Sequence, residues 1–203
     1  DSFEIGVASA KVYDFIWDTY CDWYIELTKT RLNGTDEDAK LTAQNVLCYV
    51  LVTLLKLLHP FMPFITEEIY QALPKCDGAE DILMTAQWPE YTEALDFPAE
   101  ENAMEAVMDL IRAIRGRRAE MNVPPSKKAQ LTVSTLERAV FEQGIPFLKR
   151  LAYASDVTVE GVTDAGSDDA MTAQGMVTVT THAARLFMPL AELVDLEKEK
   201  ARI

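Results

Sequence analysis

Six basic side chains gather between residues 111 and 133 of an otherwise acidic chain. The 203 residues include 19 lysines and arginines against 33 aspartates and glutamates, which gives a formal net charge of -14. Arginine binds phosphate through a planar fork of donors, and lysine binds it as a point charge. The candidate phosphate-binding residues are Arg112, Arg115, Arg117, Arg118, Lys127 and Lys128.

Two interpretations of this cluster stay open from the residues alone. In the first, the side chains form a face that contacts RNA phosphates. In the second, they are the solvated end of a helix, where positive charge also interacts favourably with the helix dipole. On a helix Arg115 and Arg118 share a face, whereas Arg117 lies about 100° away from Arg118. The arginines are therefore expected to surround the helix end.

The sequence PSKK, residues 125–128, also resembles a catalytic lysine loop that handles ATP. Such a loop needs a nucleotide pocket built on a Rossmann-type unit, in which a glycine-rich turn follows a strand. No strand with a glycine-rich turn precedes these residues, and an alternating, strand-like pattern follows them. We therefore do not interpret Lys127 as catalytic.

No other residues form a recognisable catalytic or metal site. No nucleophile has a partner base. Cys21, Cys48 and Cys76 are too widely spaced for a metal or redox pair, and the acidic runs lack the spacing of a calcium loop. His59 is interpreted as a capping or interhelix residue, and His182 has no carboxylate or cysteine at ligand spacing. We expect no catalytic residue, no metal ligand and no cofactor in this chain.

The composition limits the class of protein. Hydrophobic residues make up 49% of the chain, enough for the cores of one large or two small domains. The acidic balance argues against a protein that holds nucleic acid through its overall charge, but it does not exclude a local basic face. The most apolar run, residues 46–58, is too short to cross a bilayer and predicts a core helix. No signal peptide pattern opens the sequence, so we expect a cytoplasmic protein without a membrane partner.

Hydrophobic periodicity predicts a mainly α fold followed by a small α+β region. Apolar residues at three- and four-residue steps predict helices over residues 3–31, 35–58, 63–73 and 99–121. Beyond Pro124 and Pro125 the pattern changes to strands at 129–135 and 156–161, a helix over 137–153 bent or broken near 144–146, and two β-rich runs around 181–183. A last helix begins at Glu192. The predicted domains are 1–122, 123–191 and 192–203.

Four motifs in a fixed order resemble the anticodon-binding helical bundle of the valyl-tRNA synthetases, a family of class I aminoacyl-tRNA synthetases. They are YDFIWDTYCDWYIELTK (13–29), LLKLLHPFMPFITEEIYQAL (54–73), WP (88–89) and IRAIRGRRAEMNVPPSKK (111–128). The proline-punctuated HPFMPFITEEIY resembles the whole valine, isoleucine and leucine group, whereas the first and last motifs resemble the valine member. The closing LFMPLAELVDLEKEKARI resembles the short β unit that leads into the C-terminal coiled coil of that family.

The resemblance implies an antiparallel helix bundle of the class I anticodon-binding type, a small α+β subdomain and the start of a coiled-coil helix. It implies that the full-length enzyme attaches valine to its tRNA with ATP as a substrate, through catalytic and editing domains outside this chain. The piece alone would not be catalytic. Its implied partners are the anticodon stem-loop of tRNA(Val) and the catalytic domain of the same chain, with no obligate protein partner. Both ends continue a helical pattern, so we expect a fragment of a longer protein.

Two alternatives stay open. The bundle could be a structural docking module between the catalytic domain and the coiled coil, or it could belong to an isoleucyl or leucyl relative. Trp17, Trp23 and Tyr24 could stack on unpaired bases. Aromatic residues at helical spacing are nevertheless typical of a core, which is how we interpret them.

Overall fold

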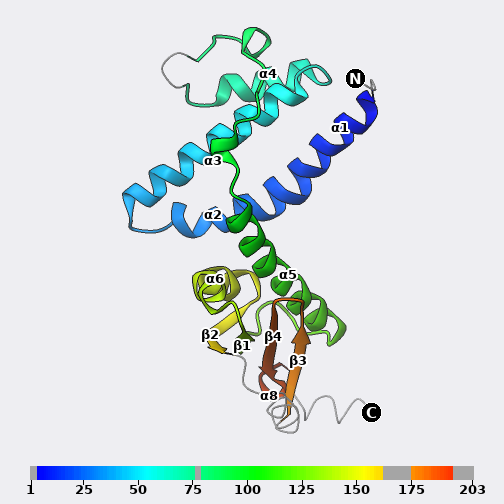
Figure 1. Cartoon of the computed structure of the whole chain (residues 1–203), viewed down its shortest axis with the longest axis vertical. Coiled ribbons are helices and arrows are strands. Elements are labelled where there is room, and N and C mark those ends of the chain that lie inside the picture. Colours follow the sequence, from blue (N-terminus) through cyan, green and yellow to red (C-terminus); the bar gives the residue numbers. More distant parts are fainter. Residues whose placement is uncertain (1–3, 76–78, 162–174, 194–203) are drawn as a thin grey trace. The chain divides into compact units, whose positions relative to one another are not determined.

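The first third of the chain is one continuous helical segment followed by an antiparallel helix (Figure 1). The computed structural model describes residues 4–75, 79–161 and 175–193. The segment comprises α1 (Ile5–Asp14), the π-helix η1 (Phe15–Tyr24) and α2 (Ile25–Leu32). Its extent confirms the predicted helix over 3–31. The π-helical middle was not predicted, because a pattern of three- and four-residue steps does not report a change to wider i→i+5 turns.

Helix α3 (Glu37–Leu58) begins at a side-chain cap. The Asp36 carboxylate accepts a hydrogen bond of 3.0 Å from the Ala39 amide, which satisfies one of the donors left over in the first turn. The helix predicted over residues 35–58 is therefore confirmed, with Asp36 as its N-cap residue. The Tyr20 hydroxyl donates to the Leu47 carbonyl at 3.0 Å and ties η1 to α3.

Helix α4 (Pro63–Ala72) has proline at its first position, where the missing amide costs no helical hydrogen bond. A small core forms where Leu55 of α3 and Tyr70 of α4 meet Leu83 of the short 3₁₀ helix η2 (Leu83–Thr85). The Glu67 carboxylate holds this loop by accepting a hydrogen bond of 2.9 Å from the Leu83 amide. A hydrogen bond from the Gln71 amide, followed by the one from Leu83, lowers the pKa of Glu67.

Helix α3 is also the one helix among the described residues that is long and apolar enough to cross a membrane. Length and composition alone do not separate such a span from the core helix of a soluble protein. Here α3 packs against α1, α2 and α4, and it carries Glu37, Asp38 and Lys40 in its first turns. Within α3 the buried residues are Ala43, Leu54 and Leu55, so the packing supports the core-helix prediction for residues 46–58 at the C-terminal end of the helix.

The second part of the chain contains a four-stranded mixed sheet in the order β2-β1-β4-β3. Strand β1 (Ala129–Thr135) pairs in parallel with β2 (Ala154–Gly161) and antiparallel with β4 (Ala184–Pro189), which pairs antiparallel with β3 (Met176–Thr180). All four strands were predicted as β-rich runs. The short helix α8 (Leu190–Leu193) follows β4 and begins two residues before the predicted Glu192, and the rest of that predicted helix lies outside the described residues. A mainly α chain with a small α+β part is therefore confirmed.

Two helices pack on each other and on this sheet. Helix α5 (Pro98–Glu120) contacts α6 (Arg138–Leu151) and β3, and α6 contacts β1 and β2. Gly144 permits a close approach of α6 to α5, because a Cβ atom there would lie 2.9 Å from Cγ2 of Val107. One helix spans both Gly144 and Pro146, so the helix is not broken near these residues, and the alternative of a bend stays a prediction.

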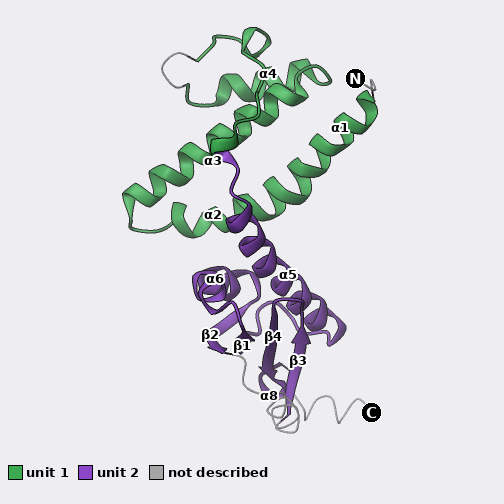
Figure 2. Cartoon of the chain, in the orientation of Figure 1, with its two compact units in different colours: residues 1–94 green, residues 95–203 purple. Residues whose placement is uncertain are grey.

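The chain divides into two compact units, Asp1–Ala94 and Leu95–Ile203 (Figure 2). The predicted boundary between residues 122 and 123 stays a prediction. The second unit includes α5 because the apolar stripe of this helix is buried against α6 and the sheet. The buried residues of that stripe are Ala106, Val107, Leu110, Ile111 and Ile114.

Candidate nucleic-acid interface

The candidate interface begins where α5 ends. Asn122 adopts a left-handed conformation with φ of 52° directly after the helix. The Asn122 amide donates to the Ala119 carbonyl at 3.0 Å, and the Val123 amide donates to the Arg118 carbonyl at 2.9 Å. This is a Schellman cap, and asparagine is one of the few residues with a side chain that tolerates the left-handed position. The cap reverses the chain sharply, so that the turn after α5 folds back against the last turn of the helix.

Arg118 lies inside this junction, with only 2% of its surface exposed. Its Nη2 donates to the Pro124 carbonyl at 3.2 Å and to the Lys127 carbonyl. Its guanidinium also lies 5.5 Å from the centre of the Tyr153 ring, in cation–π range. Burial lowers the pKa of Arg118, and the neighbouring Tyr153 acts in the opposite direction. Arginine nevertheless keeps its charge at neutral pH.

Tyr153 is the aromatic centre of the site. It has a left-handed φ of 57° directly after α6, a conformation that a bulky residue rarely adopts. The centre of its ring lies 5.9 Å from the guanidinium of Arg115. Nε of Arg115 also donates a hydrogen bond of 2.7 Å to the Leu151 carbonyl. The Tyr153 carbonyl in turn accepts from the Ala129 amide at the start of β1. Tyr153 therefore links the end of α6, the last turns of α5 and the first residue of the sheet.

Lys127 and Lys128 lie in the turn that Arg118 holds. The Lys127 amide donates to the Pro124 carbonyl at 3.0 Å, which closes the turn. Lys127 is half-buried and Lys128 is exposed. Within the described residues neither lysine side chain forms an ion pair with a carboxylate. Their charge is available to a partner.

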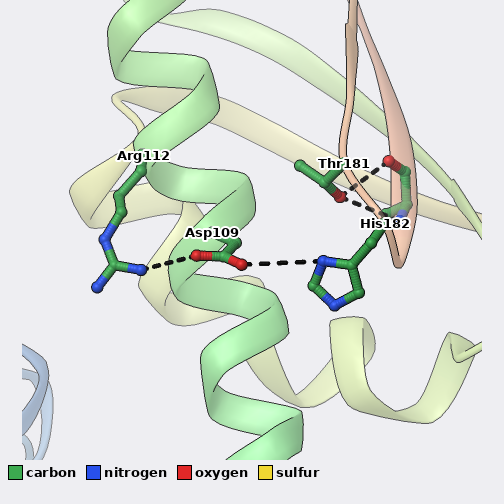
Figure 3. Close-up of polar contacts among 5 residues, drawn as sticks. Asp109, Arg112, Thr181 and His182 are labelled. Atoms are coloured by element: carbon green, nitrogen blue, oxygen red, sulfur yellow. Dashed lines mark hydrogen bonds and ion pairs between the residues drawn. The ribbon is translucent and has the colours of Figure 1, made fainter.

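Arg112 and Arg117 take part in exposed ion pairs on α5 itself. Arg112 pairs with Asp109 at 2.7 Å, and Arg117 pairs with Glu120 at 2.9 Å. Asp109 also faces His182 of the β3–β4 turn, with 3.8 Å between the carboxylate and Nδ1 (Figure 3). Exposed pairs of this kind contribute about 0.5 kcal/mol or less each. Arg117 lies roughly 200° around the helix from Arg115, at about 100° per residue, so it faces away from the Tyr153 side.

The structure thus places two of the six predicted residues, Arg115 and Arg118, at the ring of Tyr153, and Arg118 is hydrogen-bonded to the backbone of the turn that carries Lys127 and leads to Lys128. Arg112 pairs with Asp109, and Arg117 pairs with Glu120 on another side of the helix. The phosphate contact predicted for Arg118 stays a prediction, and the geometry argues against it, because the buried guanidinium binds backbone carbonyls and faces the Tyr153 ring. Tyr153 itself was missed. A helix-ending tyrosine in the left-handed region has no sequence signal, since glycine or asparagine is the usual residue there.

The aromatic residues singled out from the sequence lie in the first unit. Trp23 is buried, as a core interpretation predicts, and Tyr24 is half-buried. Trp17 is 52% exposed, so the core interpretation is wrong for this residue. His59 ends α3, and its Nδ1 lies 2.8 Å from the hydroxyl of Thr66 on α4, which confirms the interhelix interpretation.

Within residues 4–75, 79–161 and 175–193, no group of three or more histidine, cysteine or acidic side chains is placed to hold a metal ion. Cys76 lies outside the described residues.

Comparison with protein families gives a match over residues 1–133 to the anticodon-binding domain of tRNA ligase. The chain belongs to this family. The matched region of the anticodon-binding domain ends inside β1, so it includes α5, the Schellman cap and both lysines of the turn.

The relatives of this anticodon-binding chain include valine–tRNA ligases from several bacteria. The valine–tRNA ligase of Clostridium acetobutylicum is 47% identical over 205 aligned positions, that of Clostridium tetani 44% over 204, and that of Bacillus cereus 39% over 206. Each alignment covers 100% of this chain and 22% of the relative. The chain therefore spans less than a quarter of the length of the curated relatives that it matches.

Proposed function

We propose that this chain is the anticodon-recognition part of a cytoplasmic valine–tRNA ligase. In that enzyme, valine is attached to its tRNA with ATP as a substrate, by residues outside this chain. As part of this proposal, the helices of the first unit belong to an antiparallel helix bundle of the class I anticodon-binding type. The relatives named above favour valine over the isoleucine and leucine alternatives.

The observation that carries the proposal is the basic cluster at the end of α5. Arg115, Lys127 and Lys128 belong to the end of α5 and the turn after it, inside the matched anticodon-binding region and on a chain of formal net charge -14. An otherwise acidic protein repels RNA over most of its surface, so a local basic cluster determines where a phosphate backbone can approach. Phosphate contacts set the position of the RNA, and the exposed bases of a single-stranded loop supply the sequence information.

The proposed role is positional. The cluster binds phosphates of the anticodon stem-loop and holds the tRNA so that its acceptor end reaches a distant catalytic site. A tRNA that is held in register reacts as if the reaction were intramolecular, which is how binding energy far from the chemistry increases rate.

The salt dependence of tRNA binding by the full-length ligase tests this role. Replacing both lysines, as Lys127→Ala plus Lys128→Ala, removes two phosphate contacts. The slope of log affinity against log salt should become shallower by about 1.4 to 1.8, because each contact contributes about 0.7 to 0.9. An unchanged slope would contradict the proposed interface.

Arg138→Ala is the matched control. Arg138 is exposed, pairs with Glu142 at 2.6 Å and begins α6, whose opposite end carries Leu151 beside Arg115. The 14 residues of α6 separate the two ends by about 20 Å at 1.5 Å per residue. This variant loses one positive charge but no proposed contact, so its slope should remain that of the unmodified ligase.

A docking module between the catalytic domain and the coiled coil is the second candidate function. The observation that favours it is the apolar surface of α4 and its preceding turn: Phe64 is 90% exposed, Met62 50% and Ile65 49%. Exposed apolar patches of this kind mark interaction surfaces. A docking module without RNA contact leaves the anticodon loop accessible in the complex, whereas the recognition role does not.

A further inference from the structure

Arg118 is the most deeply buried charged residue among the described residues, and it touches the one turn that carries two available lysines. We propose that Arg118 is a positioning residue for RNA binding. It never contacts RNA itself, but fixes the turn over residues 124–127 so that Lys127 and Lys128 meet RNA phosphates. This inference rests on the proposed function and extends it to a buried residue.

Direct contact with RNA is excluded by the state of the guanidinium. Only 2% of Arg118 is exposed, its Nη2 serves two carbonyls, and its Nη1 is buried without a partner in the described part of the chain. A buried donor left without a partner costs about 1–3 kcal/mol. An arginine that only binds phosphate would extend its side chain into solvent and avoid the cost of the unpaired donor. The burial therefore indicates a task inside the protein.

The turn over residues 124–127 depends on hydrogen bonds from outside, because its own backbone supplies few hydrogen-bond donors. Pro124 and Pro125 have no amide hydrogen, so neither can donate a hydrogen bond to the turn. Within the turn, the Lys127 amide donates to the Pro124 carbonyl. Arg118 adds two further bonds, to the carbonyls of Pro124 and Lys127, which are the first and last residues of that turn. A planar guanidinium can hold two acceptors in a fixed relation, which a lysine ammonium on a flexible stem does much less well.

The ring of Tyr153 also contacts the guanidinium of Arg118. The ring lies 5.5 Å from Arg118 and 5.9 Å from Arg115, so the two arginines share one aromatic contact. The Tyr153 carbonyl accepts from Ala129, the residue after Lys128. The turn that carries both lysines is thereby fixed at one end by the Schellman cap of α5 and at the other by Tyr153. Arg118 connects the two.

A double-mutant cycle on the full-length ligase tests the inference. One side of the cycle is Arg118→Met, which keeps an apolar stem and removes the guanidinium. The other side is Lys127→Ala plus Lys128→Ala, and the readout is tRNA affinity as a function of salt. The lysine pair should reduce the affinity lost between about 50 mM and 200 mM salt by about tenfold, since each contact accounts for about threefold over that range. Arg118→Met should make the slope shallower in the unmodified background and should have no effect on affinity or slope once the lysines are gone.

The outcomes separate the two levels of the proposal. If the lysine pair changes nothing, both the interface and the role of Arg118 are overturned. If the lysines matter but Arg118→Met leaves the slope unchanged, or acts equally in both backgrounds, the positioning role alone is wrong. A purely structural residue would weaken binding in both backgrounds, so only the loss of effect in the second supports the inference.

If Arg118→Met does not fold, Arg118→Lys takes its place in the double-mutant cycle. It retains the positive charge but lacks the fork that serves two carbonyls. Exchange of the Lys127 amide with solvent should accelerate in this variant, and the salt slope should fall toward that of the lysine pair. A lysine variant with unmodified exchange and slope would show that charge alone suffices, which overturns the positioning role.

Discussion

Replacing Gly144 with alanine should destabilise the second unit, although the same change in most helices is stabilising. An alanine Cβ at this position would lie 2.9 Å from Cγ2 and 3.2 Å from Cγ1 of Val107. Carbon atoms in contact prefer a separation of about 3.5–4.0 Å, and Val107 is 2% exposed with a stiff, β-branched side chain. Overpacking of a core costs about 1–3 kcal/mol, from which about 1 kcal/mol is recovered because alanine favours helix over glycine. The expected net loss is about 1 kcal/mol.

Gly116 provides the matched control. It lies in α5, is exposed, and has no atom within 4 Å of the position that a Cβ would occupy. Gly116→Ala should therefore stabilise the unit by about 0.5–1 kcal/mol, through helix propensity alone. The two alanine substitutions are chemically identical and should have opposite signs.

Urea unfolding monitored by hydrogen exchange of the buried α5 amides measures both variants locally, which matters because the chain has two units. Val107→Ala closes a cycle with Gly144→Ala. The double variant should be more stable than the sum of the single effects by about 1–2 kcal/mol, because the clash is gone. Additive effects, or stabilisation by Gly144→Ala, would refute the close-approach argument.

Three further changes probe the first unit. Asp36→Ala removes the cap of α3 and should cost about 1 kcal/mol in urea unfolding, whereas Thr35→Ala should be nearly neutral. Burial is the main cause that raises the pKa of Tyr20 to about 12 from 10.0, so its contribution to stability is complete below pH 10 and should disappear as pH rises toward 12. In Tyr20→Phe that alkaline loss should be smaller, as followed by unfolding at several pH values; an equal loss would contradict the assignment. Thr66→Val leaves Nδ1 of the half-buried His59 without this partner and should cost about 1 kcal/mol in thermal or urea unfolding, and a neutral result would show that the contact contributes nothing.

Much of the fold follows from local signals in the sequence. Asp36 followed by acidic residues begins α3, Pro63 begins α4, and the alternation in residues 129–135 gives β1. These features depend on neighbours in the chain, so they can be recognised before any tertiary contact is known. The helix boundaries differ from the structure by one or two residues.

The candidate site could be predicted only in part, because it depends on contacts between distant segments. Composition indicated where positive charge gathers, but it could not separate a buried arginine from an exposed one. Arg118 and Arg117 are neighbours in sequence; the first is enclosed by the 124–127 turn and Tyr153, and the second pairs with Glu120. The assignment of α5 to the second unit likewise follows from packing that no local pattern records.

Footprinting of the anticodon stem-loop in the complex of the full-length ligase with tRNA tests the central claim most directly. If this chain recognises the anticodon, the loop bases and adjacent phosphates should be protected from chemical cleavage. The ligase that carries Lys127→Ala and Lys128→Ala should lose part of the phosphate protection at equal occupancy. Fully accessible loop bases, with the same cleavage pattern in both proteins, would contradict the account and favour a docking role.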